Sequence, residues 1–295
     1  MHIFDLNHER YQQYPVLVEV YNELRLRRYS DRTMDNYLCG IIRFLDFIGK
    51  DDPDSLDTND FRDYLFYLID ERELAPRSVN ANNFYIRFFY EAVLDKRVNH
   101  SRVHLMKIDK PIISFLNNNE IISLLNESRY DPKIDLALKL GLCAGLRISE
   151  VLSLKVSHLD IDNRLIRVID SKGRKSRLVP MDNTLVRACR RYLGEHLLND
   201  DDYLIHFRNP QHKAPTETLR VHFNSCRDKA GLPSTVTFHS LRHTFATNFM
   251  LNGGEVMTLS ALMGHSSIHT TCNYLQLTEC MKFKNRSFMD KLLEE

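Results

Sequence analysis

The strongest concentration of charge along this chain lies between residues 164 and 191. That stretch carries nine Lys or Arg residues against Asp170 and Asp182, a net charge of +7 over 28 residues. Its middle reads SKGRKSR, and the Lys-Gly pair there is typical of a hairpin turn. The cations of this segment are Lys172, Arg174, Lys175 and Arg177. Cations gathered on one hairpin tip can reach one phosphate backbone, so the segment predicts a nucleic-acid contact, with a solvated basic turn as the alternative.

A second candidate segment, FHSLRHTFATNFM, spans residues 238–250 and has helical periodicity. At 100° per residue, its apolar stripe consists of Phe238, Leu241, Phe245 and Phe249. His239 and Arg242 are three residues apart and share the flank beside that stripe. A half-buried Arg requires an anion, so this flank predicts either an anion-binding site or a structural Arg–carboxylate pair.

Two further segments each place a reactive side chain beside a glycine that ends a helix. In GHSSIHTTCNYL, Gly264 ends one helix, His265 follows in the turn, and Tyr274 comes nine residues later on another helix. In AGLRISEVLSL, Gly145 ends a helix and Arg147 lies in the turn that follows. Taken alone, each of these patterns is weak, because a single His or Tyr usually serves packing.

Zinc is the alternative that the spacing of the histidines raises. The pairs His239/His243 and His265/His269 are each four residues apart, and each could present two imidazoles on one helix face. However, HSLRH lacks the acidic residue of an HExxH motif, and Arg242 between the two ligands would repel a divalent cation. The sequence therefore predicts no metal site, and a zinc hydrolase is the weakest interpretation.

Considered together, these residues resemble the tyrosine recombinase (phage integrase) family, and within it the minimal, Xer-like two-domain members. The resemblance rests on an Arg in a Gly-Leu-Arg-x-Ser-Glu turn, a hairpin Lys, an HxxR pair, a Gly-His and a Tyr, all in the family's order. It implies a catalytic set of Arg147, Lys172, His239, Arg242, His265 and the nucleophile Tyr274. It also implies that Glu150 supports Arg147, and that Lys172 rather than Lys175 is the hairpin lysine.

The resemblance implies a site-specific DNA recombinase that cuts and rejoins strands through a 3′-phosphotyrosyl intermediate, with no metal, cofactor or ATP. Arg147 and Arg242 would stabilise the charge that develops on the phosphate oxygens, and His265 would add a further donor. A base such as His239 would assist Tyr274, and a lysine would protonate the leaving 5′-hydroxyl. The implied partner is double-stranded DNA with paired recombination sites, on which four protomers assemble. A type IB topoisomerase and a DNA-binding regulator with a relic site remain as alternatives.

Residues 1–108 are predicted to form a helical domain. Apolar residues recur at three- and four-residue steps over residues 9–28, 32–48, 58–72 and 77–96. The resemblance implies that this four-helix unit is the SAM-like core-binding domain, which clamps DNA. Arg77 and Arg87 are the predicted DNA contacts on it.

Residues 109–295 are predicted to form the catalytic domain, and the chain as a whole is expected to be mainly α. Helices are expected at residues 118–127 and 132–145, and again from Thr184 almost to the end. Between them, HLDIDNRLIRVIDSKGRKSRLVPM alternates apolar and polar residues, which predicts a small three-stranded antiparallel sheet and an α+β domain. The amphipathic tail, residues 281–295, is expected to pack on its own domain or to dock on a neighbouring protomer.

Overall composition excludes several classes of protein. The 295 residues include 40 Lys or Arg and 39 Asp or Glu, which gives a net charge of +1. This balance excludes a polycationic protein that binds DNA through its overall charge. That balance averages an acidic first part, with 16 basic and 19 acidic residues up to position 110, and a basic remainder with 24 and 20. The six cysteines form no CxxC pair, the first residues do not resemble a signal peptide, and no apolar run approaches about 18 residues. We therefore expect a cytoplasmic protein with free thiols and no membrane partner.

Overall fold

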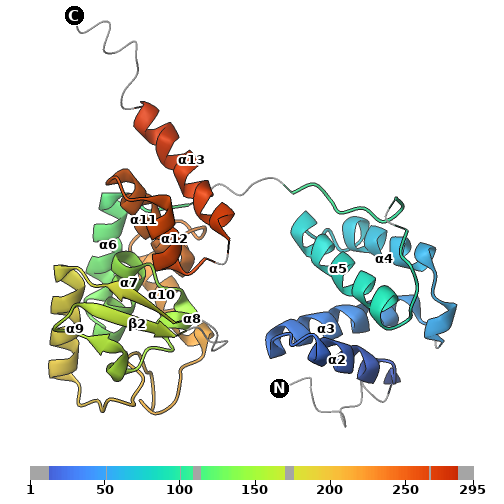
Figure 1. Ribbon diagram of the computed structural model, residues 1–295, viewed down its shortest axis with the longest axis horizontal. Coiled ribbons are helices and arrows are strands. Elements are labelled where there is room, and N and C mark those ends of the chain that lie inside the picture. The colour runs from blue at the N-terminus through green and yellow to red at the C-terminus, as the bar shows by residue number, and fades with distance from the viewer. Residues whose placement is uncertain are drawn as a thin grey trace, which may run out of the picture. The chain divides into compact units, whose positions relative to one another are not determined.

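A computed structural model describes residues 13–50, 52–99, 101–108, 114–169, 176–265 and 267–284, without the side chains of residues 276, 277 and 279–284. The chain divides into two compact units, residues 1–111 and 112–295, each of which is described by itself (Figure 1). No helix within the described ranges has the length and apolar character that a bilayer span requires.

Over residues 13–108, as far as the structure describes them, the N-terminal unit contains four longer α-helices, as the sequence predicts. Its helices are α2 (Leu17–Leu26), α3 (Asp31–Ile48), α4 (Thr58–Asp70) and α5 (Pro76–Ala92), with a short 3₁₀ turn, η1 (Pro53–Ser55) (Figure 1). Local signals set the starts: the Ser30 hydroxyl accepts from the Thr33 amide, Asp57 and Asp60 form a capping box, and Pro76 occupies a first-turn position. Side chains such as Phe44, Phe61 and Phe89 fill the core.

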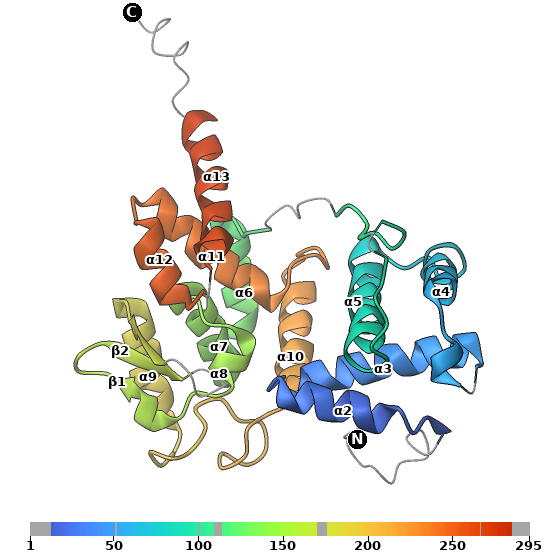
Figure 2. The same cartoon turned by 45° about the vertical axis from the view of Figure 1, so that its right-hand side comes forward.

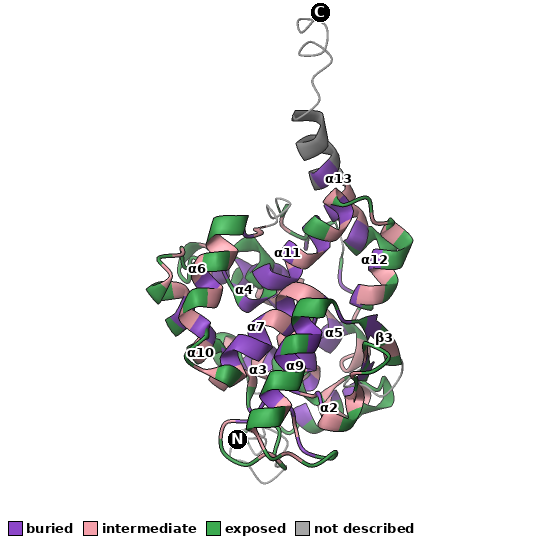
Figure 3. Cartoon of the chain, turned by 90° about the vertical axis from the view of Figure 1, so that its left-hand side faces the viewer, coloured by how far each residue is buried: buried purple, intermediate pink, exposed green. Residues whose placement is uncertain are grey.

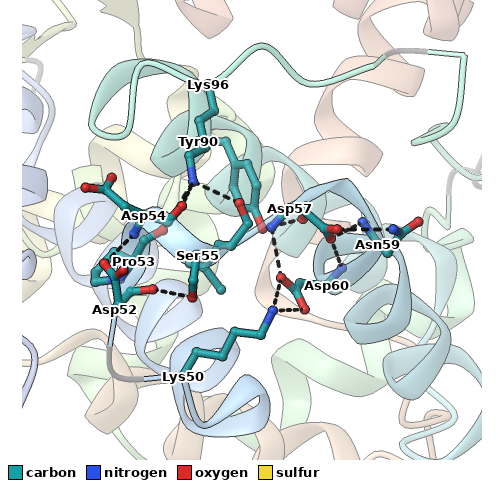
Figure 4. Close-up of polar contacts among 11 residues, drawn as sticks. Lys50, Asp52, Pro53, Asp54, Ser55, Asp57, Asn59, Asp60, Tyr90 and Lys96 are labelled. Carbon is teal, nitrogen blue, oxygen red and sulfur yellow. Dashed lines mark hydrogen bonds and ion pairs between the residues drawn. The ribbon is translucent and has the colours of Figure 1, made fainter.

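Figure 4 shows the polar network that fixes the connection between α3 and α4. The Lys96 ammonium donates to the backbone carbonyls of Pro53, Asp54 and Leu56. The Tyr90 hydroxyl donates to the Asp57 carbonyl at 2.7 Å, and Lys50 pairs with Asp60, also at 2.7 Å. These bonds tie the backbone of the loop to Lys96 and Tyr90, which come from the segment after α5 and from α5, and so fix its conformation.

The chain that leaves α5 is pinned back onto that helix by amide side chains. The Asn80 amide donates to the Met106 carbonyl at 2.9 Å and accepts from the Met106 amide at 2.8 Å. Asn83 donates to the His104 carbonyl, and the Arg87 guanidinium donates to the Val103 carbonyl at 3.1 Å. Residues 103–106 therefore belong to the N-terminal unit, and Arg87, predicted to contact DNA, makes a bond that holds them there.

The C-terminal unit combines helices with a small sheet, which confirms the predicted fold class. Its helices are α6 (Asn118–Ser128), α7 (Pro132–Ala144), α8 (Ile148–Val151), α9 (Asn183–Glu195), α10 (Thr216–Lys229), α11 (Phe238–Leu251), α12 (Val256–Met263) and α13 (Ile268–Lys284). The strands β1 (Leu159–Asp160), β2 (Leu165–Ile169) and β3 (Ser176–Pro180) pair antiparallel in that order. A 3₁₀ turn, η2 (Val156–His158), precedes β1.

Helix α7 is the centre of this unit. It packs against both α9 and α11, and most of its residues are buried (Figure 3). Helices α12 and α13 pack on α11 and on each other, and α12 also contacts β3 (Figure 2). The ends of α7 and α12 and the start of α11 therefore meet in one region.

The segment between α9 and α10 differs from the sequence prediction. Helix was expected there, but residues 196–215 form a long loop. Pro210 and Pro215 cannot donate a helical hydrogen bond, and the Asn-Asp-Asp-Asp run at 199–202 favours turns. The loop is anchored by the amide of Leu204, which donates to the Leu154 carbonyl at 2.8 Å, and by its buried Leu204 and Ile205 side chains.

Gly145 ends α7 in a left-handed conformation, with φ at 63°. A Cβ added to it would lie 2.4 Å from Cδ1 of Phe245 on α11. Glycine is therefore required twice, for the backbone angle and for the close approach of the two helices.

We predict that Gly145→Ala lowers the free energy of unfolding far more than Gly231→Ala does. Gly231 has a similar φ of 69° but open space around it, so its substitution costs only the left-handed strain, about 1–2 kcal/mol. At Gly145 the contact with Phe245 adds about 1–3 kcal/mol of overpacking. Urea unfolding of the two variants measures this difference, and equal losses would contradict the packing role.

Candidate active site

Helix α11 carries three of the groups that meet in this region. His239, Arg242 and His243 all lie in its first two turns. Arg242 is buried, with its side chain 1% exposed, whereas His243 is half-buried and His239 is exposed. The rings of His239 and His243 meet edge to face, with centroids 4.4 Å apart. The helix therefore presents a guanidinium inward and two imidazoles beside it.

The buried Arg242 guanidinium is held by the carboxyl ends of two helices. It donates to the carbonyl of Gly145, which follows α7, and to the carbonyl of Met263, the last residue of α12, each at 2.6 Å. Carbonyls at helix carboxyl ends lack intrahelical partners and carry partial negative charge, which favours a cation there. Burial, together with the nearby Arg147, lowers the Arg242 pKa to about 10, so it stays protonated at neutral pH.

A buried carboxylate, Glu150, links three guanidiniums. Its Oε1 accepts from Arg147 at 2.8 Å, both of its oxygens accept from Arg177 at 2.8 and 2.9 Å, and Oε2 lies 3.7 Å from Arg242. Oε2 also accepts from the Arg147 amide at 2.8 Å, which caps α8. Burial acts to raise the Glu150 pKa, but the bonds from Arg177 and Arg147 outweigh it and hold the pKa below its ordinary value.

Arg147 is the more accessible of the two arginines in the predicted catalytic pair. Its side chain is 38% exposed, compared with 1% for Arg242. Its guanidinium also donates to the carbonyl of Gly264 at 3.3 Å. An anion entering from solvent would therefore meet Arg147 first, with the charge of Arg242 behind it.

His265 is positioned by Gly264 and by a buried threonine. Gly264 ends α12 with φ at 62°, and the His265 amide then donates to the Ser260 carbonyl at 3.1 Å. Nδ1 of His265 lies 2.8 Å from the hydroxyl of Thr271, which is fully buried on α13. Burial and the adjacent arginines lower the His265 pKa to about 4, so the imidazole is neutral at pH 7.

Tyr274 lies on α13 and is 3% exposed. Its ring belongs to the apolar cluster formed by Ala246, Met250, Leu259 and Met263. Its hydroxyl lies 2.6 Å from Nδ1 of His243. Burial raises the Tyr274 pKa, although Arg242 and Arg147 act to lower it, so the phenol is protonated at neutral pH.

The structure thus brings together most of the predicted catalytic residues from elements far apart in sequence. They are Arg147, His239, Arg242, His265 and Tyr274, with Glu150 among them. Lys172, Arg174 and Lys175 lie outside the described residues, as do residues 285–295 of the tail. In the N-terminal unit, Arg77 is exposed in the first turn of α5.

Two expectations differ from what the structure shows. Arg177 was expected to face DNA from the hairpin, but its side chain is 15% exposed and its guanidinium binds Glu150. His239 was expected to serve Tyr274 as a base, but within the described residues it is His243 that bonds to the phenol. His243 was considered only as a zinc ligand, although its place four residues after His239 puts it on the same helix flank.

Thr271, which bonds to His265, was not identified from the sequence, and a threonine on a helix carries no signal of such a role. In the ranges that the structure covers, no group of three or more His, Cys, Asp or Glu side chains could hold an ion.

Comparison with known proteins identifies the family. The model of the phage integrase family matches residues 114–280, and that of the phage integrase N-terminal SAM-like domain matches residues 16–100. This chain belongs to the phage integrase family. The family matches cover both structural units, with the integrase match on the unit that contains Arg147 and Tyr274.

Individual relatives agree with this placement. The chain is 30% identical to a putative integrase/recombinase, y4qK, of Sinorhizobium fredii over 264 residues, 89% of this chain and 84% of the relative. It is 29% identical to tyrosine recombinase XerC of Leptospira interrogans over 272 residues, 88% and 87% of the two chains. The chain is thus a tyrosine recombinase, an enzyme class that breaks and rejoins DNA strands.

The fold is also that of a solved integrase. A lambda integrase tetramer bound to a Holliday junction matches with a TM-score of 0.70 at 19% identity, covering 88% of this chain and 76% of the integrase. At this identity the likeness concerns the fold.

We predict that Glu150→Gln destabilises the catalytic unit by about 3–5 kcal/mol, because it leaves buried guanidiniums without a counter-charge. The Glu150 pKa is depressed in the folded state, so its charge stabilises the fold above the pKa of the unfolded carboxyl, about 4.3, and that contribution is lost as pH falls. Urea unfolding of wild type and variant at several pH values should show their difference shrinking in acid.

Glu217→Gln is the matched control for this experiment. Glu217 pairs with Arg220 at 3.4 Å, but its side chain is 73% exposed, so its removal should leave stability unchanged at every pH. Equal behaviour of the two variants would contradict the central role of Glu150.

Proposed function

We propose that this protein is a site-specific DNA recombinase in which Tyr274 is the nucleophile and a 3′-phosphotyrosyl link is the intermediate. The observation that carries the proposal is the convergence of Arg147, Arg242 and His265 on the carboxyl ends of α7 and α12, with Tyr274 in the same apolar cluster as Met263 at the end of α12. A phenol beside two fixed guanidiniums is suited to attack on a phosphodiester.

In this proposal the arginines stabilise the charge that develops on the non-bridging oxygens of the phosphate. Arg147, whose side chain is 38% exposed, contacts those oxygens directly, while the buried Arg242 contributes positive potential from behind it. His265, held by Thr271, adds a hydrogen-bond donor. These groups are in place before DNA arrives, so little reorganisation is required during the reaction.

The leaving 5′-oxygen needs a proton, and we assign that role to Lys172. This residue lies between β2 and β3 in the chain, and β3 carries Arg177, which bonds to Glu150 in the site. The connection to β3 supports a lysine near the scissile phosphate. A lysine ammonium close to a phosphate is a suitable general acid.

The proposed partner is double-stranded DNA with paired recombination sites, bound by four protomers, as in the lambda integrase tetramer on its Holliday junction. We assign clamping of the duplex to residues 1–108, through exposed cations such as Arg77, and the chemistry to residues 109–295. Hairpin residues Arg174 and Lys175 would add backbone contacts. The reaction would take place in the cytoplasm, where bacterial DNA is found.

Arg177 acts in this proposal as a positioning residue rather than a DNA contact. It binds Glu150 through two nitrogens, and its Nε donates to the Leu262 carbonyl at 2.6 Å. It thereby ties the strand after the hairpin both to the support of Arg147 and to the end of α12, which precedes His265. Its effect on the reaction is exerted through those residues.

We predict that Tyr274→Phe abolishes covalent protein–DNA adducts, because the hydroxyl is the attacking group, while DNA binding is retained. The tagged protein is purified from its host under denaturing conditions, and DNA attached to it is sequenced. The recovered sequence then supplies a nicked suicide substrate for measurements in solution. Adducts that persist in Tyr274→Phe would overturn the proposal.

Related activities give different outcomes in the same system. Relaxation of a supercoiled plasmid that lacks the recovered sites would indicate a topoisomerase. Binding to the recovered DNA without cleavage by wild type would indicate a regulator.

We predict that Arg177→Met slows cleavage of that substrate by about 10²-fold, the cost of misplacing catalytic groups, with little change in DNA affinity. Arg167→Met is the matched control, since it removes the same charge from an exposed position on β2, outside the Glu150 network. If Arg177→Met instead lowers DNA affinity and leaves the cleavage rate of bound DNA unchanged, Arg177 is a DNA contact and not a positioning residue.

A further inference from the structure

His243 contacts the hydroxyl of the proposed nucleophile at hydrogen-bond distance, yet the roles assigned above do not use it. It follows Arg242 on α11, and its Nδ1 lies 2.6 Å from the hydroxyl oxygen of Tyr274, 31 residues away on α13. The two rings are tilted by 48°, with centroids 5.6 Å apart. This distance and the burial of Tyr274 define a specific contact between two helices.

The protonation states of the pair determine the direction of the hydrogen bond. Burial lowers the His243 pKa to about 4, assisted by His239, Arg242 and His265, so the imidazole is neutral at pH 7. Burial raises the pKa of the Tyr274 phenol, which is therefore protonated. A neutral imidazole with its hydrogen on Nε2 has an acceptor at Nδ1, and the phenol donates to it.

The surroundings of His243 are positively charged, and bound DNA would change that. The groups that face it are cationic or imidazole groups, namely His239, Arg242 and His265. An anionic phosphate held by Arg147, with Arg242 nearby, would offset that positive potential and make protonation of His243 easier. The basicity of this imidazole thus increases when a substrate is in place.

We propose that His243 is the general base that accepts the phenolic proton of Tyr274 during DNA cleavage, an inference that rests on the proposed role of Tyr274. The bond between Tyr274 Oη and phosphorus forms as the bond between phosphorus and the 5′-oxygen breaks. The Oη proton passes to Nδ1 of His243, and the leaving 5′-oxygen takes a proton from the ammonium of Lys172.

The same residue serves the rejoining step in reverse. When a 5′-hydroxyl attacks the phosphotyrosyl phosphorus, the imidazolium of His243 returns its proton to Oη as the phenolic oxygen leaves. The lysine accepts the proton of the incoming hydroxyl. A change at His243 therefore slows cleavage and rejoining together and leaves the equilibrium amount of adduct unchanged.

His239 is the competing candidate for this role. It is exposed and contacts His243 through ring packing, one helical turn from it. A substitution at His239 therefore provides a matched control on the same helix face.

The first test is His243→Asn, whose side-chain oxygen can accept the hydrogen bond but cannot hold the proton. We expect the rate of adduct formation on the nicked suicide substrate to fall about 10²–10⁴-fold, the range for loss of a general base. DNA affinity and the melting temperature should remain close to those of wild type. On an intact substrate, adduct should reach the wild-type level more slowly.

The second test replaces Tyr274 with 3,5-difluorotyrosine, whose phenol is more acidic and depends less on a base. In this background we expect the deficit of His243→Asn to shrink by about tenfold or more, while that of His239→Asn stays as large as before. If His243 only positioned the Tyr274 hydroxyl, a more acidic phenol would not restore the cleavage rate of His243→Asn.

Each result decides for or against the inference. A wild-type rate in His243→Asn, or rescue of His239→Asn instead, would overturn it while leaving Tyr274 as nucleophile. Persistent adducts in Tyr274→Phe would overturn the proposed function itself. If His243→Asn does not fold, His243→Gln replaces it. Wild-type cleavage is also measured in D₂O and in H₂O, and we expect it to be slower in D₂O. An equal rate in the two solvents would exclude the proton transfer.

Discussion

The buried carboxylate of Glu150 is the interaction on which the rest of the site depends. Arg147, Arg177 and Arg242 all lie within 4 Å of it, and without its charge three guanidiniums would repel one another at close range. One carboxylate leaves the group with two uncompensated positive charges. That excess is what an anionic phosphate would neutralise, so the stability of the site and its affinity for a substrate have the same electrostatic origin.

Two helix ends supply the hydrogen-bond acceptors for Arg242. Arg242 is almost inaccessible to water, and its hydrogen bonds go to carbonyls at the ends of α7 and α12. The carbonyls at those ends can accept hydrogen bonds from Arg242 because Gly145 and Gly264 adopt a left-handed conformation, which ends each helix and redirects the chain. The same turns release Arg147 and His265 beside the carbonyls. Two short glycine signals therefore place three of the functional groups, namely Arg147, Arg242 and His265.

Much of the fold could be predicted from the sequence because its signals are local. The periodicity of α3, the Asp57 and Asp131 caps, the glycine that ends α7 and the alternation in β2 and β3 each act within a few residues. The loop at 196–215 carries local signals of its own, in Pro210, Pro215 and the turn-forming run at 199–202, but its anchor to Leu154, about fifty residues earlier, could not be predicted. Arg177 was misjudged for a similar reason, since a basic hairpin indicates a phosphate contact unless a distant carboxylate is known to lie beneath it.

By itself, the sequence determined the kinds of chemical group present, their order along the chain and the helices, turns and strands that carry them. These depend on short-range periodicity and on the preferences of glycine, proline and capping residues. Only the tertiary structure decided that Arg242 is buried while Arg147 is exposed, that Arg177 turns to Glu150, and that His243 rather than His239 meets Tyr274. Those outcomes depend on how α7, α11, α12 and α13 pack, because burial and distance between remote residues are properties of the packed helices and not of any one segment.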